Sequence, residues 1–272
     1  MGSRRIRQAV RDKYGVVAKT SSSCCGSASC CPTSPSSDIS EQLGYTQEEI
    51  SGVPEGANMG LGCGTPLAFA QLREGETVID LGSGGGFDCF LAVRQVGASG
   101  KVVGVDMTPE MIEKARDNAE RGRYENVDFR LGELEHLPVR DGEADVLISN
   151  CVINLVPDKN QVFAEAFRAL RPGGRISVSD MVLLRPWPQG VRKTAESYAA
   201  CLAGAVLKDE YLEAIRKAGF EDVEVAAESS AAGLLGDDAG EELAKTFGVS
   251  ADELRQAIES AASIQVTAAK PI

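Results

Sequence analysis

The amino-acid sequence predicts an α/β fold whose sheet is mostly parallel and has an antiparallel last strand. Short apolar segments alternate with amphipathic helical segments between residues 76 and 180, and this alternation is typical of parallel strands joined by crossover helices. A glycine-rich turn at residues 82–86 follows the first of these apolar segments. Two further apolar segments near the end of the sequence fit a sheet that closes with an antiparallel hairpin.

The N-terminal segment, residues 1–60, is expected to hold a helix and a cysteine-rich arm. Residues 6–17 have the spacing of a short amphipathic helix. Residues 20–37 contain no charged and no aromatic residue, so they bury too little apolar surface to fold alone. Thr46, with Glu49 three residues later, predicts a capping box at the start of a short helix. The glycine-rich residues 53–65 are expected to form a loop.

The central segment, residues 61–182, is expected to supply the first five strands and the helices between them. Thr108 as N-cap and Pro109 at the first helical position predict a helix that reaches about residue 121. Asp158 is expected to cap the next helix, which the Arg-Pro-Gly-Gly sequence at residues 171–174 stops. Another helix is expected at residues 87–96, and strands are expected at residues 77–81, 101–106, 127–132, 144–149 and 175–180.

The C-terminal segment, residues 183–272, shows a looser alternation. Ser250 and Glu253 predict a second capping box, which opens a helix that reaches about residue 261. The region 232–247 would be an insertion between the last two strands. The other elements expected here are a helix at residues 208–218 and strands at residues 220–226 and 263–268.

Composition excludes several classes of partner. The chain has 272 residues, of which 43% are hydrophobic and 25% charged, as in ordinary soluble proteins. Its net charge of −12 argues against a nucleic acid or an anionic membrane as the main partner, because both attract basic surfaces. No apolar stretch approaches a membrane span, and residues 1–14 lack the apolar core of a secretory signal. We therefore expect a cytoplasmic protein, acting as a monomer.

The glycine-rich turn indicates a nucleotide-like ligand, because backbone amides and the start of the following helix point at whatever binds there. Phe87 stands where the dinucleotide fingerprint requires its third glycine, which disfavours a nicotinamide cofactor. Asp80, directly before the turn, suits a ligand with an ammonium group at that end. Asp106, at the end of the second strand, can bind two ribose hydroxyls. A positive amino-acid end and a ribose together describe S-adenosylmethionine; a turn with only a structural role is the alternative.

With these residues, the stretch from about 76 to 180 resembles the class I S-adenosylmethionine-dependent methyltransferases, which have a Rossmann-like sheet. The resemblance implies that residues 80–86 surround the methionine part of the cofactor and that Asp106 and Met107 meet the ribose and adenine. It also implies that residues 133–135 flank the adenine and that Asn150 lies beside the methyl donor. The cofactor-binding residues implied are Asp80, Gly82, Ser83, Gly84, Gly86, Asp106, Met107, Glu133, Leu134, Glu135 and Asn150.

The methyl acceptor is suggested by cysteines rather than by a general base. His136 is the only histidine and is interpreted as structural, as is Cys89, a small buried hydrophobic residue. Cys151 follows the fourth strand directly, at the edge where open α/β sheets bind ligands. With Cys63 and Cys201, it would make a pyramidal site of three thiolates, which select soft centres such as trivalent arsenic. Each lone cysteine could instead be a small buried hydrophobic residue.

The sequence Ser-Asn-Cys-Val-Ile-Asn-Leu-Val-Pro-Asp-Lys at residues 149–159 resembles the arsenite methyltransferase family, as do residues 62–64 and 76–90. The resemblance, over about residues 40–220, implies arsenic(III) bound by Cys63, Cys151 and Cys201, with residues 183–272 holding the C-terminal arsenite-binding region. It also implies that an N-terminal cysteine takes part in reducing the arsenic, with thioredoxin or glutathione as the external reductant. The candidates for that role are Cys24, Cys25, Cys30 and Cys31.

Other interpretations remain open from the sequence. Tyr198-Ala199-Ala200 stands before Cys201 where the family resemblance would place a Gly-Glu pair. A methyltransferase with a small organic acceptor would need a base and would make no use of Cys63. A zinc-binding protein could use the paired N-terminal cysteines, although the usual spacing of zinc ligands is absent. The number of methyl groups added, the use of antimonite and a role for residues 229–250 are not predicted.

Overall fold

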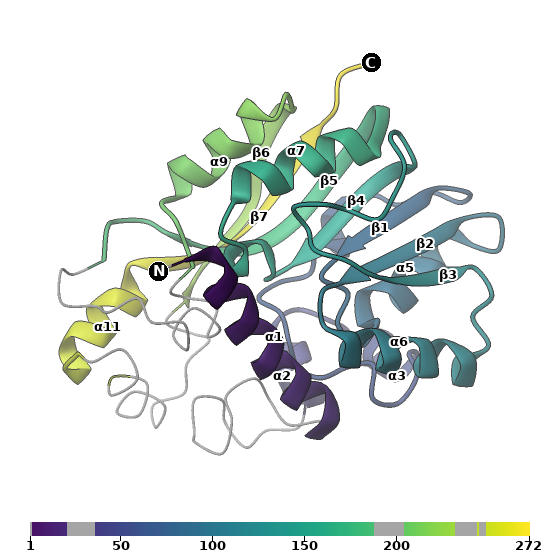
Figure 1. The fold of residues 1–272 in the computed structure, drawn as a ribbon, viewed down its shortest axis with the longest axis horizontal. Helices are drawn as coiled ribbons and strands as arrows, with labels where there is room; N and C mark the ends of the chain where they lie inside the picture. Colours follow the sequence, from purple (N-terminus) through teal and green to yellow (C-terminus); the bar gives the residue numbers. More distant parts are fainter. Residues whose placement is uncertain (1, 21–35, 188–203, 232–243, 245–248) are drawn as a thin grey trace.

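The structure, a computed structural model, describes residues 2–20, 36–187, 204–231, 244 and 249–272. Within these residues, one seven-stranded sheet has the order β3-β2-β1-β4-β5-β7-β6 (Figure 1). Strand β7 runs antiparallel to both of its neighbours, and the other pairs are parallel. The predicted sheet is therefore confirmed. Its strands are β1 (Thr77–Leu81), β2 (Lys101–Asp106), β3 (Val127–Leu131), β4 (Ala144–Asn150), β5 (Leu170–Leu183), β6 (Glu221–Ser230) and β7 (Ala261–Ala269).

Helices cover both faces of this sheet. Because side chains alternate along a strand, Val78 joins a core with Phe90 of α5, whereas the next residue, Ile79, joins a core with Phe163 of α7 and Tyr211 of α9. The helices are α1 (Ser3–Thr20), α2 (Ser36–Gln42), α3 (Gln47–Ser51), α4 (Leu67–Ala70), α5 (Phe87–Val96), α6 (Pro109–Gly122), α7 (Lys159–Ala169), α9 (Lys208–Lys217) and α11 (Ala251–Glu259), with a 3-10 turn, η1 (Ile153–Leu155).

Most predicted helix starts are confirmed. The Thr46 and Ser250 capping boxes are both present, and the Asp158 side chain accepts a hydrogen bond from the backbone N–H of Gln161. Thr108 is an exception: it precedes Pro109 as predicted, but its side chain makes no capping hydrogen bond. The sequence therefore located the start of α6 correctly and assigned the wrong role to this hydroxyl.

Two strands are longer than predicted. β5 begins at Leu170, one residue before the segment expected to stop the helix, and continues to Leu183, beyond the expected end at residue 180. β6 likewise extends to Ser230. Both extensions pair with β7, for example Leu183 with Ala261 and Ser230 with Ala262. Pairing with β7, between residues 78 apart for Leu183 and 32 apart for Ser230, stabilises these ends, and no local sequence pattern indicates it.

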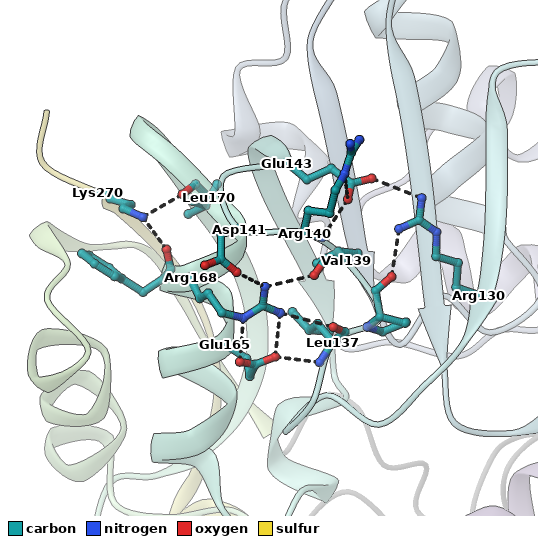
Figure 2. A network of polar contacts seen from close by, with 12 residues as sticks. Arg130, Leu137, Val139, Arg140, Asp141, Glu143, Glu165, Arg168, Leu170 and Lys270 are labelled. Atoms are coloured by element: carbon teal, nitrogen blue, oxygen red, sulfur yellow. Dashed lines mark hydrogen bonds and ion pairs between the residues drawn. The ribbon is translucent and has the colours of Figure 1, made fainter.

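The connection between β3 and β4 is held against α7 by a polar network centred on Arg168 (Figure 2). The Arg168 guanidinium donates to Asp141 Oδ1 at 2.7 Å and to the backbone carbonyls of Leu137 and Val139. The Glu165 carboxylate pairs with Arg168 and accepts from the backbone N–H of Leu137 at 2.8 Å. These bonds fix the residues that follow β3, which border the cavity described below.

Helix α1 lies across the end of the sheet beside α6 (Figure 1). Arg7 pairs with Glu135 at 2.9 Å, Arg11 with Glu133 at 3.4 Å, and Lys19 with Glu110 at 2.9 Å. Its apolar residues Ile6 and Val10 are buried against the end of η1. None of the helices in the described residues combines the length and apolar character that crossing a membrane requires.

Candidate functional site

A cavity of about 270 Å³ lies at the carboxyl ends of β1, β2 and β4, where open α/β sheets bind ligands. The glycine turn after β1 and the start of α5 form its floor, and residues 57–63 form one wall. Helix α1 contributes Arg7, Val10 and Tyr14. The site therefore combines the predicted turn with an N-terminal helix that sequence analysis assigned no role.

The glycine turn is shaped by its backbone. The N–H groups of Gly82 and Ser83 both donate to the Val105 carbonyl, at 2.7 and 3.0 Å. Gly82 has φ +80°, and a Cβ there would meet Val152 Cγ2 at 2.5 Å, so only glycine fits. Gly84 has φ +51° with no atom within 4 Å of an added Cβ, so it faces open space.

Gly86 does not line the cavity, although it was predicted to bind the cofactor. A Cβ at Gly86 would meet the Phe90 ring at 2.7 Å, so this glycine permits close packing at the start of α5. Gly82, Ser83 and Gly84 do line the cavity, and Gly85 lines it as well. The turn predicted to bind the cofactor therefore lies at the cavity, whereas Gly86 within it has a packing role.

Asp80 and Asp106, the two carboxylates predicted to bind the cofactor, both line the cavity. Asp80 is buried at the end of β1, and the Cys89 thiol donates to its Oδ2 at 3.2 Å. Burial and the neighbouring Asp88 raise the pKa of Asp80 well above its usual value. Asp106 accepts hydrogen bonds from the backbone N–H groups of Gly84 and Thr108, which opposes the rise that burial causes in its pKa. Cys89 thus orients a carboxylate as well as filling space.

A third buried carboxylate, Asp88, was not predicted. It lies in the first turn of α5 and lines the cavity. Tyr45 donates its hydroxyl to Asp88 Oδ1 at 2.6 Å, and Asn150 donates to Oδ2 at 3.2 Å. Burial raises the pKa of Asp88 to about 6, while the two hydrogen bonds oppose the rise. An acid among the apolar residues that begin this helix was a usable signal for Asp88, but nothing local marked Tyr45.

Asn150 connects this carboxylate to the loop that carries Cys63. Its Oδ1 accepts from the backbone N–H of Cys63 at 3.0 Å, and its Nδ2 donates to the Gly64 carbonyl at 2.8 Å. The same Nδ2 lies 3.0 Å from the Tyr45 hydroxyl, so its two hydrogens are shared among three acceptors. Asn150 lines the cavity, and it also holds the Cys63 loop against the end of β4.

Cys63 and Cys151 are brought together and are both buried, at 5% and 8% exposure. Their sulfur atoms and a carboxylate oxygen of Asp180 all lie within 4.8 Å of one another. Cys151 has φ +59°, a left-handed conformation that costs a non-glycine residue about 1–2 kcal/mol. The bond from its N–H to the Ser179 carbonyl, at 2.8 Å, holds this conformation. Both cysteines also line the cavity.

Asp180 was predicted only as the end of a strand. It is 1% exposed and accepts hydrogen bonds from the N–H groups of Asn154 and Met181 and from the Tyr211 hydroxyl, at 2.8, 2.9 and 3.1 Å. Burial raises the pKa of Asp180 to about 7, and the positive charge of Lys159 opposes the rise. The residue that joins the two thiols therefore comes from strand β5, whereas Cys63 lies in a loop and Cys151 follows β4.

Most of the residues predicted to flank the adenine lie at the cavity. Met107, Leu134 and Glu135 line the cavity. Glu133 is not among the lining residues and instead pairs with Arg7 and Arg11 of α1. His136 is exposed beside this segment and is not among the residues that line the cavity. Cys24, Cys25, Cys30, Cys31 and Cys201 lie outside the described residues.

Known proteins resemble this chain along most of its length. Residues 72–219 match a family model described as a methyltransferase domain. An arsenite methyltransferase from Halobacterium salinarum is 47% identical over 239 residues, which cover 85% of this chain and 61% of that protein. The crystal structure of an arsenic(III) S-adenosylmethionine methyltransferase from Chlamydomonas reinhardtii aligns with a TM-score of 0.63 and 33% identity, covering 88% of this chain and 74% of that one. The chain belongs to the arsenite methyltransferase family.

Members of the arsenite methyltransferase family from other organisms match this chain over a similar share of their own length. The mouse protein is 32% identical over 249 residues, 64% of its length. The chain thus spans about three fifths of the length of the curated relatives that it matches. A phosphoethanolamine N-methyltransferase from Haemonchus contortus, at 18% identity and a TM-score of 0.60, shares the fold.

Proposed function

We propose that this protein is an arsenite methyltransferase, which transfers methyl groups from S-adenosylmethionine to thiol-bound trivalent arsenic and so detoxifies it. The observation that carries the proposal is the position of two buried thiols on the wall of a cavity with a glycine turn. Cys63 and Cys151 approach within 4.8 Å of each other and line the same cavity as Asp80 and Gly84. Soft thiolates select a soft, thiophilic centre, and the cavity supplies room for its methyl donor.

The cavity residues fit S-adenosylmethionine by charge and by shape. Asp80 and Asp88 are buried, and neither forms an ion pair within the described residues, so a ligand with an ammonium and a sulfonium group would compensate both. The Ser83 hydroxyl is buried with no hydrogen-bond partner in the part of the chain that the structure describes. Gly84 faces open space. When bound, the cofactor supplies an electrophilic methyl group.

Each part of the cavity suits one part of that molecule. Asp80 would hold the ammonium group, and Asp106 the ribose hydroxyls through lone pairs that its backbone donors leave available. Met107 and Leu134 would offer apolar contacts to the adenine. Asn150, between Asp88 and the Cys63 loop, would border the methyl group. These assignments leave the thiols facing the reacting end of the cavity.

The chemistry of the thiols follows from their proximity. Cys63, Cys151 and Cys201 would replace the sulfur or oxygen ligands of incoming arsenite, leaving an arsenic lone pair directed at the methyl carbon. Transfer forms an As–C bond and oxidises arsenic by two electrons. Two cysteine thiols return these electrons by forming a disulfide, for which Cys24, Cys25, Cys30 and Cys31 are the N-terminal candidates. An external thiol reductant, thioredoxin or glutathione, then reduces the disulfide.

Separation of arsenic species tests the proposal. Purified protein is incubated with arsenite, S-adenosylmethionine and a thiol reductant, and products are resolved by chromatography with elemental detection. We expect methylated arsenic from the unchanged protein and none from Cys63→Ser or Cys151→Ser. Cys89→Ser is the matched control, because its hydroxyl can still donate to Asp80, and it should retain activity. Cofactor binding without any methylated arsenic would contradict the proposal and indicate an organic acceptor.

The reductive role is tested separately. A variant with alanine at Cys24, Cys25, Cys30 and Cys31 should bind arsenite and stop after one methyl transfer, because the electrons for arsenic reduction are missing. Product counted per protein molecule distinguishes one turnover from many. Undiminished multiple turnover in this variant would remove the N-terminal cysteines from the mechanism.

A further inference from the structure

Asp180 places a carboxylate directly beside the pair of thiols. Its oxygen and the sulfur atoms of Cys63 and Cys151 lie within 4.8 Å of one another. Asp180 belongs to β5, whereas Cys151 follows β4 and Cys63 lies in the loop before α4. The family resemblance and the cysteine pattern both point to sulfur ligands only, so this carboxylate has no assigned task.

The carboxylate is held in one orientation by donors on several sides. The N–H groups of Asn154 and Met181 and the hydroxyl of Tyr211 all donate to it. The Tyr211 hydroxyl interacts electrostatically with Asp180, Cys63 and Cys151, so the four groups form one electrostatic cluster. These three donors favour the ionised carboxylate, and burial opposes them. In its ionised form, Asp180 presents a preorganised negative charge to the thiols, and not to solvent.

Charge moves during the proposed transfer. The lone pair of arsenic forms the new As–C bond, the C–S bond to the methyl group breaks, and its electron pair remains on sulfur. The formal positive charge consequently leaves sulfur and appears on arsenic, which then carries the methyl group and its thiolate ligands. A fixed negative charge near arsenic stabilises the transition state, in which this positive charge develops, more than it stabilises the ground state. Such preorganised groups lower reaction barriers.

We propose that Asp180 stabilises the positive charge that arsenic acquires during methyl transfer. The inference rests on the proposed function, since it concerns the same reaction at the same thiols. It divides the carboxylates of the site into two groups. Asp80 and Asp88 line the cofactor cavity, where positive charge is lost, whereas Asp180 adjoins the thiols, where positive charge is gained. The Asp180 side chain thereby favours methyl transfer to arsenic over the reverse reaction.

A purely structural role for Asp180 makes a different prediction. If the residue only anchored η1 through the N–H of Asn154, its loss would loosen Cys151 and weaken arsenite binding. If it acts by charge, its isosteric replacement should leave arsenite and cofactor binding intact and slow only the chemical step. Removing one preorganised group from such a site typically slows the chemical step by about 100-fold or more.

Single-turnover kinetics distinguish the two roles. Protein loaded with one equivalent of arsenite is mixed with excess S-adenosylmethionine, quenched, and assayed for methylated arsenic. We expect Asp180→Asn to slow this step about 100-fold with unchanged arsenite stoichiometry and cofactor affinity. Tyr211→Phe, which removes one hydrogen bond but keeps the charge, should have a much smaller effect. Asp128→Asn, at a half-exposed acid in β3 that pairs with Arg130, controls for loss of an acid elsewhere.

The outcomes separate this inference from the proposed function. Absence of methylated arsenic from the unchanged protein would overturn both. Methylation that proceeds at the same rate in Asp180→Asn would overturn only the role of Asp180, and so would a variant that no longer binds arsenite. A rate loss confined to the chemical step would support it.

A second measurement uses the unchanged protein and does not depend on activity. The tetramethylphosphonium ion has the charge and shape of a four-coordinate cationic centre, and tert-butyl alcohol is a neutral molecule of similar size. Alkylation of Cys63 and Cys151 by iodoacetamide is followed by peptide mass spectrometry with each probe present. We expect the cation to protect both thiols several-fold better than the alcohol. Equal protection by the two probes would overturn the proposal, even if Asp180→Asn failed to fold.

Discussion

The cofactor cavity and the thiol site share a wall but are built in different ways. The cavity floor is a local structure: residues 82–86 follow β1 directly, and their shape depends on backbone bonds to the neighbouring strand at Val105. The thiol site is assembled from three remote segments, which carry Cys63, Cys151 and Asp180. The first type of site needs small residues at fixed spacings, and the second needs long-range side-chain bonds. Asn150 contacts both regions.

Substitution at Gly82 should break the cavity floor and give the largest loss. Gly82→Ala would place a Cβ against Val152 and force a positive φ on alanine, which we expect to lower the free energy of unfolding by about 3 kcal/mol. Gly84→Ala is the matched control: it has the same type of φ but no neighbour within 4 Å, so it should cost only about 1 kcal/mol. Urea denaturation measures both, and equal losses would show that crowding at Val152 contributes nothing.

Loss of Asn150 should disconnect the two regions. Asn150→Ala leaves the N–H of Cys63 and one oxygen of Asp88 without these partners, which costs about 2 kcal/mol of stability. It should also speed alkylation of the Cys63 thiol. Asn126→Ala, which removes bonds to the Gly97 and Gly100 carbonyls, should lower stability but leave Cys63 as protected as before. Identical alkylation rates in the two variants would argue against a specific role for Asn150.

The buried carboxylates should make cofactor binding depend on pH. The pKa of Asp88 is raised to about 6, so the group is largely protonated at pH 5 and ionised at pH 7. A cationic ligand prefers the ionised form; affinity for S-adenosylmethionine should therefore rise about tenfold from pH 5 to pH 7. Isothermal titration calorimetry measures this change, and Asp88→Asn should flatten it. A fall in affinity over the same interval would contradict the charge argument.

The raised pKa of Asp88 makes folding stability change with pH in the opposite direction to cofactor affinity. Because the folded-state pKa of Asp88 lies above its unfolded value, the protonated group stabilises the fold. Its contribution is complete below about pH 4 and is lost as the pH rises toward 6. Asp88→Asn should remove that part of the pH dependence.

The α1 contact should have the smallest effect. Arg7 pairs with the buried Glu135, but its own side chain is 30% exposed, and such pairs contribute about 0.5–1 kcal/mol. Arg7→Ala should therefore weaken cofactor binding only a few-fold, and the loss should shrink in high salt. Arg4→Ala, on the exposed face of α1, should have no effect. A large loss would show that α1 closes the cavity.

Sequence patterns were sufficient for the elements that depend on neighbours in the chain. The alternation of strands and helices, the glycine turn and the two capping boxes all follow from local sterics and local hydrogen bonds. Asp80 and Asp106 could be placed because the carboxyl ends of parallel strands meet at one edge. The same reasoning placed Cys151 at that edge, directly after β4. The family resemblance also implied cofactor-binding roles for Gly86 and Glu133, which do not line the cavity.

Tertiary structure decided what depends on segments far apart in sequence. Tyr45 and Asp88 meet across 43 residues, and Tyr211 and Asp180 across 31, and no local pattern signals either contact. The full lengths of β5 and β6 depend on pairing with β7. Sequence alone predicted a nucleotide-like cavity and a site of three thiols, of which the described residues include Cys63 and Cys151. Only packing could join a buried carboxylate to those thiols, because the pairing of β4 with β5 brings Asp180 to the same edge as Cys151.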